Sequence, residues 1–142
     1  MRLTSLTAVL ATCFSFTAAA QDTTAARPAA PAASSISVAV VLTNNVVDRA
    51  PQDTVTTLAA PAEADTVYLW TRVSGAEPGT VLHHVWFKGD EQVADVELTI
   101  NGSPWRTWSR KTIGAGDTGS WRVEVRDAAG TVLQTVSFTV GA

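Results

Sequence analysis

The chain has 142 residues, with 10 Lys and Arg, 13 Asp and Glu, and a single cysteine. This length fits one domain of ordinary size and is too short for two. The formal net charge of −3 argues against bulk nucleic-acid binding, because proteins of that class carry a basic footprint. With one cysteine the chain has no internal disulfide, so a disulfide scaffold is excluded.

Residues 1–20 have the pattern of an export signal. Arg2 gives a short positive region, an apolar stretch runs from about residue 6 to residue 16, and three alanines precede a cut before Gln21. The apolar stretch is shorter than the roughly 20 residues that a permanent membrane-spanning helix needs. We therefore expect a periplasmic or extracellular protein, peripheral to the membrane at most.

Cys13 offers a minor alternative, in which the exported protein is lipid-anchored. Leu10-Ala11-Thr12-Cys13 is similar to a lipoprotein box, although Thr12 is bulkier than the residue usually found there. If the cut falls before Gln21 instead, the mature protein has no cysteine, which excludes cysteine-based metal and redox sites.

Residues 21–35 predict a disordered linker, and residues 36–142 predict one folded domain. The first segment consists mainly of Ala, Pro, Ser and Thr. Because it has almost no large apolar side chain, it cannot bury enough surface to offset the entropy lost on ordering. It is typical of a flexible tether between a cleavage site and a domain.

Seven strands are predicted in the domain, because β-branched and aromatic residues alternate with polar ones at period two. The predicted strands lie near residues 36–43, 66–73, 81–88, 91–100, 105–113, 119–127 and 132–140. Gly89-Asp90 predicts a tight hairpin between the third and fourth of them. Short strands at this spacing indicate an all-β fold, an antiparallel β-sandwich of immunoglobulin-like type without a disulfide. A small closed barrel is the alternative.

The segment Trp105–Lys111 combines two tryptophans with three cations. Successive side chains of a strand face opposite sides, so the segment divides into two sets. The even-numbered set is Arg106, Trp108 and Arg110, and the odd-numbered set includes Trp105, Thr107 and Ser109.

The loop 114–118 predicts a hairpin between this strand and the next one. In the next strand Trp121 and its neighbouring valines form the core face. A register slipped by one residue would bury Arg106 and Arg110 unpaired against those valines, which is very costly. The favoured register places the even-numbered set opposite Arg126, Glu124 and Arg122, so one outward face would carry four arginines, Glu124 and Trp108.

Two interpretations of that face stay open. In the structural one, guanidinium groups stack on the indole, worth about 0.5–1 kcal/mol at exposed sites, and Glu124 pairs with two arginines. In the functional one, arginines bind a carboxylate or phosphate while the indole stacks on a ring. The candidate binding residues are Arg106, Trp108, Arg110, Arg122 and Arg126.

The other candidate residues give no catalytic or metal site. His83 and His84 are adjacent and face opposite sides of a strand, so they cannot bind one metal together. His84 shares a face with Trp86, which predicts a packed histidine whose ring donates to a backbone carbonyl. No serine has the context of a nucleophile elbow. We expect no enzyme activity and no cofactor.

Several motifs, in order, resemble the bacterial family called domain of unknown function 2914. They are His84-x-Trp86, Trp105-Arg106-Thr107-x-Ser109, Gly119-x-Trp121-Arg122-Val123, Gly130-x-x-Leu133, and the earlier stretch Asp48-Arg49-Ala50-Pro51. The resemblance covers about residues 40 to 140. Where that family usually has an acidic residue before the proline, this chain has Ala50.

The resemblance implies an envelope protein of bacteria and brings no established activity. It leaves His84, Trp86, Trp105, Thr107, Ser109 and Trp121 as family-motif residues with a structural role. We expect a non-enzymatic module that binds an envelope component, either a protein or an anionic glycan. The alternative is a structural or assembly accessory domain without a ligand of its own, and a hydrolase is the third and weakest hypothesis.

Overall fold

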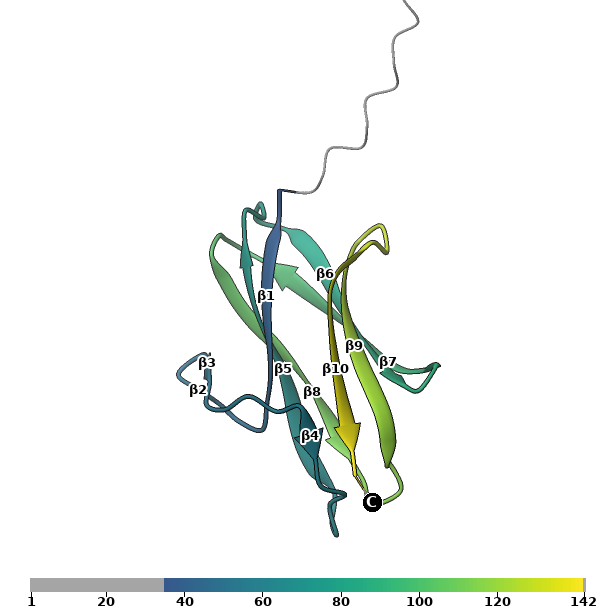
Figure 1. Ribbon diagram of the computed structural model, residues 1–142. Coiled ribbons are helices and arrows are strands. Elements are labelled where there is room, and N and C mark those ends of the chain that lie inside the picture. Colours follow the sequence, from purple (N-terminus) through teal and green to yellow (C-terminus); the bar gives the residue numbers. More distant parts are fainter. Residues whose placement is uncertain (1–34, 142) are drawn as a thin grey trace, which may run out of the picture. The chain divides into compact units, whose positions relative to one another are not determined.

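The structure is a computed structural model that describes residues 35–141. This part of the chain has ten strands and no helix (Figure 1). The strands are β1 (Ser37–Thr43), β2 (Val46–Val47), β3 (Ala50–Pro51), β4 (Thr57–Leu58), β5 (Asp65–Ser74), β6 (Thr80–Lys88), β7 (Glu91–Ile100), β8 (Trp105–Ile113), β9 (Gly119–Asp127) and β10 (Val132–Val140). The predicted export signal, Cys13 and nearly all of the predicted linker lie outside the described residues. Residues 35–141 contain no helix that is long and apolar enough to cross a membrane.

The seven long strands are the seven that the sequence predicts, within one residue at each end. The three strands it missed, β2, β3 and β4, have two residues each. A segment of two residues is too short to show a period of two, so alternation could not reveal them.

The strands form two larger sheets and one small hairpin. One sheet has the order β1-β5-β8, the other has the order β4-β10-β9-β6-β7, and β2 pairs with β3. Figure 1 shows β1, β5 and β8 on one side of the molecule and β6, β9 and β10 on the other. Among the long strands, the first, second and fifth share one sheet, and the third, fourth, sixth and seventh share the other. This order is immunoglobulin-like, with the fourth strand added to the sheet of the third, sixth and seventh.

One apolar core lies between the two sheets. Leu69 and Val73 enter it from the three-stranded sheet, and Trp86, Val123 and Phe138 from the five-stranded sheet; all five are buried. The ring of Phe138 stacks on Trp121 at a centroid distance of 5.8 Å and meets Trp86 edge-on at 6.4 Å. The predicted β-sandwich is therefore confirmed, and the closed barrel is wrong.

The predicted hairpin between β8 and β9 is also wrong. β8 pairs with β5, while β9 lies between β6 and β10 in the other sheet. The loop 114–118 instead crosses from one sheet to the other. Asp117 shapes it, because its carboxylate accepts a hydrogen bond from the Gly114 amide at 2.8 Å and its carbonyl accepts one from the Trp121 indole at 2.8 Å.

This crossing has one large consequence for the predicted outward face. Trp121, Val123 and Val125 are buried, so the even-numbered residues of β9 point outward from the five-stranded sheet. The even-numbered residues of β8 point outward from the three-stranded sheet. The arginines of the two strands therefore lie on the outer faces of different sheets, and the single face with four arginines does not form.

Candidate functional site

The alternation predicted for β8 is confirmed. Arg106, Trp108 and Arg110 are exposed, whereas Ser109 and Ile113 are buried. Trp108 keeps 37% of its surface exposed, the largest fraction among the tryptophans of the chain. Trp105 and Thr107, predicted to face inward, are half-buried.

Strand β5 supplies the neighbours of these side chains. Its register places Tyr68 opposite Arg110, Trp70 opposite Trp108, and Arg72 opposite Arg106. These three residues of β5 were not predicted from the sequence as part of the site. The alternation of the strand does indicate that their side chains face outward, because the even positions from 68 to 72 alternate with four buried residues. These are Val67, Leu69, Thr71 and Val73.

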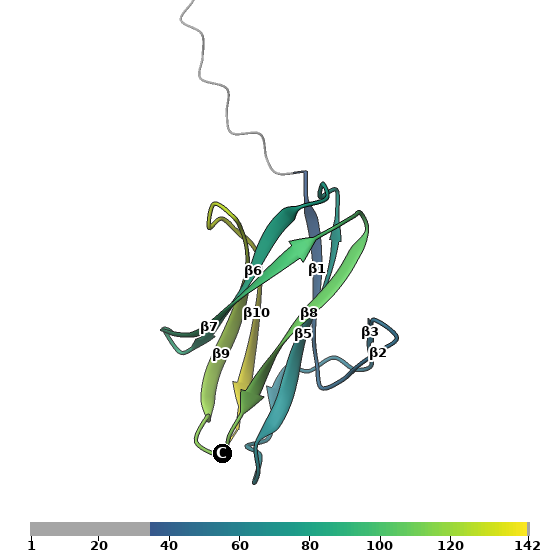
Figure 2. The ribbon, with the colours of Figure 1, turned by 180° about the vertical axis from the view of Figure 1, so that it is seen from behind.

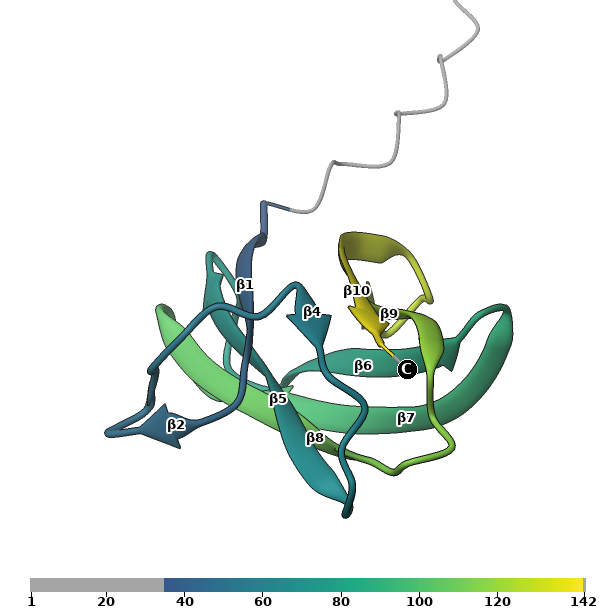
Figure 3. The ribbon, with the colours of Figure 1, turned by 60° about the horizontal axis from the view of Figure 1, so that its bottom comes forward.

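The β2–β3 hairpin covers part of this outer face. Figure 3 shows it beside β1 and β5, away from β9 and β10. The indole of Trp70 donates a hydrogen bond to the carbonyl of Arg49 at 2.9 Å, which is why Trp70 is only 8% exposed although it points outward. The Arg49 guanidinium donates to the carbonyl of Arg106 at 3.2 Å and lies 5.4 Å from the ring of Trp105.

The exposed part of this surface is cationic and aromatic. We call it the Arg/Trp face and define it by Tyr68, Arg72, Arg106, Trp108 and Arg110. Within residues 35–141, none of its three arginines makes an ion pair with a carboxylate. Arg72 and Arg106 occupy directly opposite positions, an arrangement in which like charges destabilise a sheet.

Two open hollows flank Trp108. The first is lined by Val46, Tyr68, Val96, Trp108, Ser109 and Arg110. The second is lined by Arg49, Glu97, Leu98, Thr99, Trp105, Arg106, Thr107 and Trp108. Both lie along β8, which is the last strand of its sheet and comes close to β7, the last strand of the other (Figure 2). Each hollow therefore combines Trp108 with one arginine of β8.

Arg122 and Arg126, two of the predicted binding residues, do not join this site. On the outer face of the five-stranded sheet, the Nε atoms of Arg122 and Arg126 donate to the Glu124 carboxylate at 3.1 and 2.8 Å. Arg122 also donates to the carbonyl of Gly89 at 2.6 Å. Its guanidinium lies 4.0 Å from the ring centroid of the buried Phe87, and that of Arg126 lies 5.6 Å away.

Glu124 is the centre of this paired group. Burial raises the pKa of its carboxyl, but hydrogen bonds from Arg126 and Arg122 outweigh burial and the net shift of the pKa is downward. Glu124 therefore stays ionised between the two guanidinium groups. Arg122 and Arg126 therefore fit the structural interpretation, because both guanidinium groups bind the Glu124 carboxylate within the domain.

His84 lies at the centre of a buried polar network. Its Nε2 lies 3.0 Å from Thr71 Oγ1 and its Nδ1 lies 2.8 Å from Ser109 Oγ. The Trp86 indole donates to the same Ser109 oxygen at 3.2 Å. The predicted packed histidine is confirmed, but the predicted bond to a backbone carbonyl is wrong, since both ring nitrogens bind side-chain hydroxyls. Burial lowers the pKa of His84 to about 4, so its imidazole is neutral near pH 7.

The contact between Ser109 and His84 joins a hydroxyl to an imidazole, as in a nucleophile–base pair. His84 is 0% exposed and Ser109 is 4% exposed. The serine oxygen also accepts the Trp86 hydrogen bond. This arrangement suits a satisfied polar network in the core, because each of these buried polar atoms has a hydrogen-bond partner.

His83, the neighbour of His84, faces the other way as expected. Its Nδ1 lies 2.8 Å from the carboxylate of Asp95 on β7. Among the described residues, no group of three or more His, Cys, Asp or Glu side chains is arranged to hold a metal ion.

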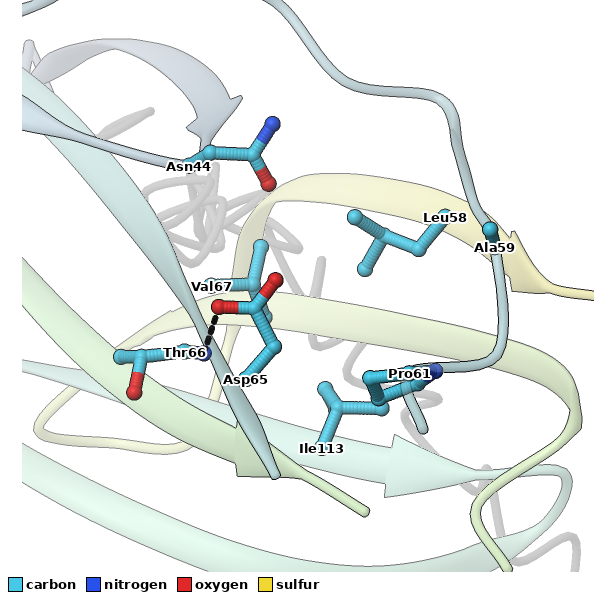
Figure 4. A pocket seen from close by; sticks show the side chains of 8 residues that line it. All are labelled: Asn44, Leu58, Ala59, Pro61, Asp65, Thr66, Val67 and Ile113. Atoms are coloured by element: carbon cyan, nitrogen blue, oxygen red, sulfur yellow. Dashed lines mark hydrogen bonds between the residues drawn. The ribbon is translucent and has the colours of Figure 1, made fainter. Parts of the chain in front are cut away.

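Figure 4 shows a small pocket whose lining includes no residue of the Arg/Trp face. It is lined by Asn44, Leu58, Ala59, Pro61, Asp65, Thr66, Val67 and Ile113. Its volume of about 10 Å³ holds one water molecule at most. The Asp65 carboxylate in it accepts a hydrogen bond from the Thr66 amide at 2.7 Å. With no basic side chain in its lining, this pocket has no acid–base pair.

The family comparison confirms the resemblance seen in the sequence. The model of the family described as "Protein of unknown function (DUF2914)" matches residues 79–140, which span β6 to β10. This range is narrower than the resemblance read from the motifs. It includes Arg106, Trp108 and Arg110, whereas Asp48-Arg49-Ala50-Pro51 lies outside it.

Other comparisons add little. No curated protein matches the chain. Among solved structures, the chain is similar to a beta-glucosidase from Listeria innocua, seen in complexes with isofagomine and with glucose, at 11% identity and a TM-score of 0.40 for each. These similarities cover 76% of this chain and 16% of the glucosidase, so the chain spans about a sixth of that enzyme's length. Nothing about activity follows from them.

Proposed function

We propose that this chain, whose residues 79–140 match the model of the DUF2914 family, is an exported, non-enzymatic module that binds an anionic component of the bacterial envelope. The binding surface is the Arg/Trp face. The observation that carries the proposal is the pair Arg72 and Arg106, which lie opposite each other with no carboxylate partner in residues 35–141. A bound anion would relieve the repulsion between them.

The contrast between the two outer faces supports this choice of surface. On the five-stranded sheet, Glu124 neutralises Arg122 and Arg126 from within the domain. On the three-stranded sheet, three exposed guanidinium groups surround an exposed indole. Arginine forks bind carboxylate and phosphate groups in two-point contacts, and an exposed indole adds a flat apolar surface.

The export part of the proposal rests on the sequence of residues 1–20, which combines a positive start, an apolar stretch and three small residues before Gln21. The non-enzymatic part rests on the burial of the Ser109 and His84 pair. A general base must reach its substrate, and the imidazole of His84 is fully buried, which supports a function without catalysis.

A second candidate function is a structural or assembly accessory domain with no ligand of its own. The paired group around Glu124 favours it, and so does the hydrogen bond that holds the β2–β3 hairpin to Trp70. In that case, the arginines of the Arg/Trp face would serve stability alone.

The experiment that separates the two functions replaces Arg106 and Arg110 by Ala in the purified protein. Binding is measured to anionic glycans, peptidoglycan fragments and envelope proteins, together with the melting temperature. The binding module predicts lost binding at an unchanged or higher melting temperature, since repulsion between cations is removed. Unchanged binding with a lower melting temperature would support the accessory domain. Lys111→Ala, which removes one charge from the opposite side of the same strand, is the matched control.

A further inference from the structure

We infer that the ligand of the Arg/Trp face is a glycan rich in uronic acids, bound with one sugar ring over Trp108 and one sugar unit in the hollow on each side of it. This inference rests on the proposed function and names its ligand class. It starts from two features of the site, the order of side chains along β8 and the different linings of the two hollows.

Along β8 a cation, an indole and a second cation follow one another on the outer face. Arg106 and Arg110 are each two residues from Trp108, and a strand rises about 3.4 Å per residue. Their backbone positions therefore lie about 7 Å from Trp108 on either side. A chain of rings with regularly spaced carboxylates, laid along the strand, places a ring over the indole while two carboxylates reach the two guanidinium groups.

The hollow at Arg110 offers one cation beside apolar and aromatic side chains. Tyr68, Val46 and Val96 line it beside Trp108. The carbon-bound face of a sugar ring suits such a surface, and the hydroxyl of Tyr68 both donates and accepts hydrogen bonds. This hollow therefore fits one sugar unit whose carboxylate points to Arg110.

The hollow at Arg106 is lined by side chains of both positive and negative charge. Arg49 and Arg106 supply donors, Glu97 supplies an acceptor, and Thr99 supplies a hydroxyl. In the described part of the chain Glu97 makes no ion pair. A ligand that fills this hollow must bring a negative charge for the arginines and a hydrogen-bond donor for Glu97.

A uronic acid meets both demands, because one sugar unit carries a carboxylate and several hydroxyl donors. A polyphosphate or a fully sulfated chain brings negative charge with few donors, so Glu97 would repel it. An acidic peptide lacks the flat ring for which Trp108 is placed. A planar carboxylate also matches the two-point geometry of a guanidinium group.

Isothermal titration of the purified protein with oligogalacturonate tests the inference. The matched ligands are its fully methyl-esterified form, which keeps the rings and loses the charge, dextran sulfate, and polyglutamate. We expect oligogalacturonate to bind at least tenfold more tightly than each of the other three. Trp108→Leu and Arg110→Gln should each weaken that binding at least tenfold, while Lys111→Gln changes it less than twofold.

The outcomes separate the inference from the proposed function. If polyglutamate or dextran sulfate binds as tightly as oligogalacturonate, and Trp108→Leu changes binding less than twofold, the glycan inference is wrong and the anion-binding module stands. If no anion binds the wild type, both are wrong. Circular dichroism checks that each variant is folded, and protection of Trp108 from iodide quenching in the wild type gives a second readout of the same contact.

Discussion

The buried imidazole of His84 predicts a specific pH dependence of stability. Burial lowers its pKa from 6.5 to about 4. In the unfolded chain the imidazole takes up a proton as the pH falls below 6.5, while in the folded protein it stays neutral down to about pH 4. Above pH 6.5 both states are neutral and the folded protein has its full stability. Between pH 6.5 and 4 the unfolded state binds more protons, so the free energy of unfolding decreases.

The size of the effect follows from the two pKa values. One pKa unit corresponds to 1.36 kcal/mol, so the gap between 6.5 and about 4 is worth about 3 kcal/mol. This is a large part of the roughly 5–15 kcal/mol that stabilises a typical domain. The contacts with Thr71 and Ser109 keep the neutral ring in place, and a protonated ring would be a buried charge without a carboxylate.

The assay is urea unfolding at a series of pH values from 7.5 to 4, followed by tryptophan fluorescence. Carboxylates also titrate at the acidic end, so the result is read as the difference between the wild type and His84→Gln, whose amide keeps a donor and an acceptor. The wild type should lose about 3 kcal/mol more than the variant across this range.

Parallel curves for the wild type and His84→Gln would refute this reasoning, because they would mean that the imidazole takes up its proton as readily in the folded protein as in the unfolded chain.

Two further substitutions test the packing around the candidate site. Glu124→Gln leaves Arg122 and Arg126 without their shared carboxylate and should lower the free energy of unfolding by about 2 kcal/mol in urea titrations; a change below 0.5 kcal/mol would show that the group adds no more than an ordinary surface pair. Trp70→Phe removes the hydrogen bond to the Arg49 carbonyl and should cost about 1 kcal/mol. It should also speed amide exchange in the β2–β3 hairpin, and exchange as slow as in the wild type would contradict the role given to that bond.

Alternation predicts which way each side chain points in this domain, and it does so well. Arg106, Trp108 and Arg110 face outward as expected, and Trp121 faces the core. Parity is a local property, set by the pleat of one strand. It needs no knowledge of the rest of the fold, which explains why this part of the prediction is confirmed.

Parity does not say which strands are neighbours, and here the prediction is wrong. A five-residue loop suits both a hairpin and a crossing between sheets. The sequence did hold a contrary signal, because the hairpin would have placed Arg110 directly opposite Arg122 and Arg106 opposite Arg126. Two like-charge pairs in one ladder are unfavourable. In the fold, Arg110 meets Tyr68 instead, and only Arg106 keeps a like-charged neighbour.

The residues of the site that were not predicted depend on contacts between segments that lie far apart in the sequence. Arg72 and Tyr68 join the Arg/Trp face only because β5 pairs with β8. Arg49 reaches Arg106 over 57 positions of sequence, from a hairpin whose strands have two residues each. These contacts depend on the immunoglobulin order of strands, which the number and spacing of strands suggest without fixing the individual pairs.

The central claim is that anions bind on the outer face of the three-stranded sheet and not on the five-stranded sheet. The most direct test is a nuclear magnetic resonance titration of the isotope-labelled protein with oligogalacturonate and, separately, with dextran sulfate. We predict that the shifted backbone amides gather on β5 and β8, around Arg72, Trp108 and Arg110. Shifts gathered around Arg122 and Arg126 on β9, with β8 unchanged, would contradict the claim.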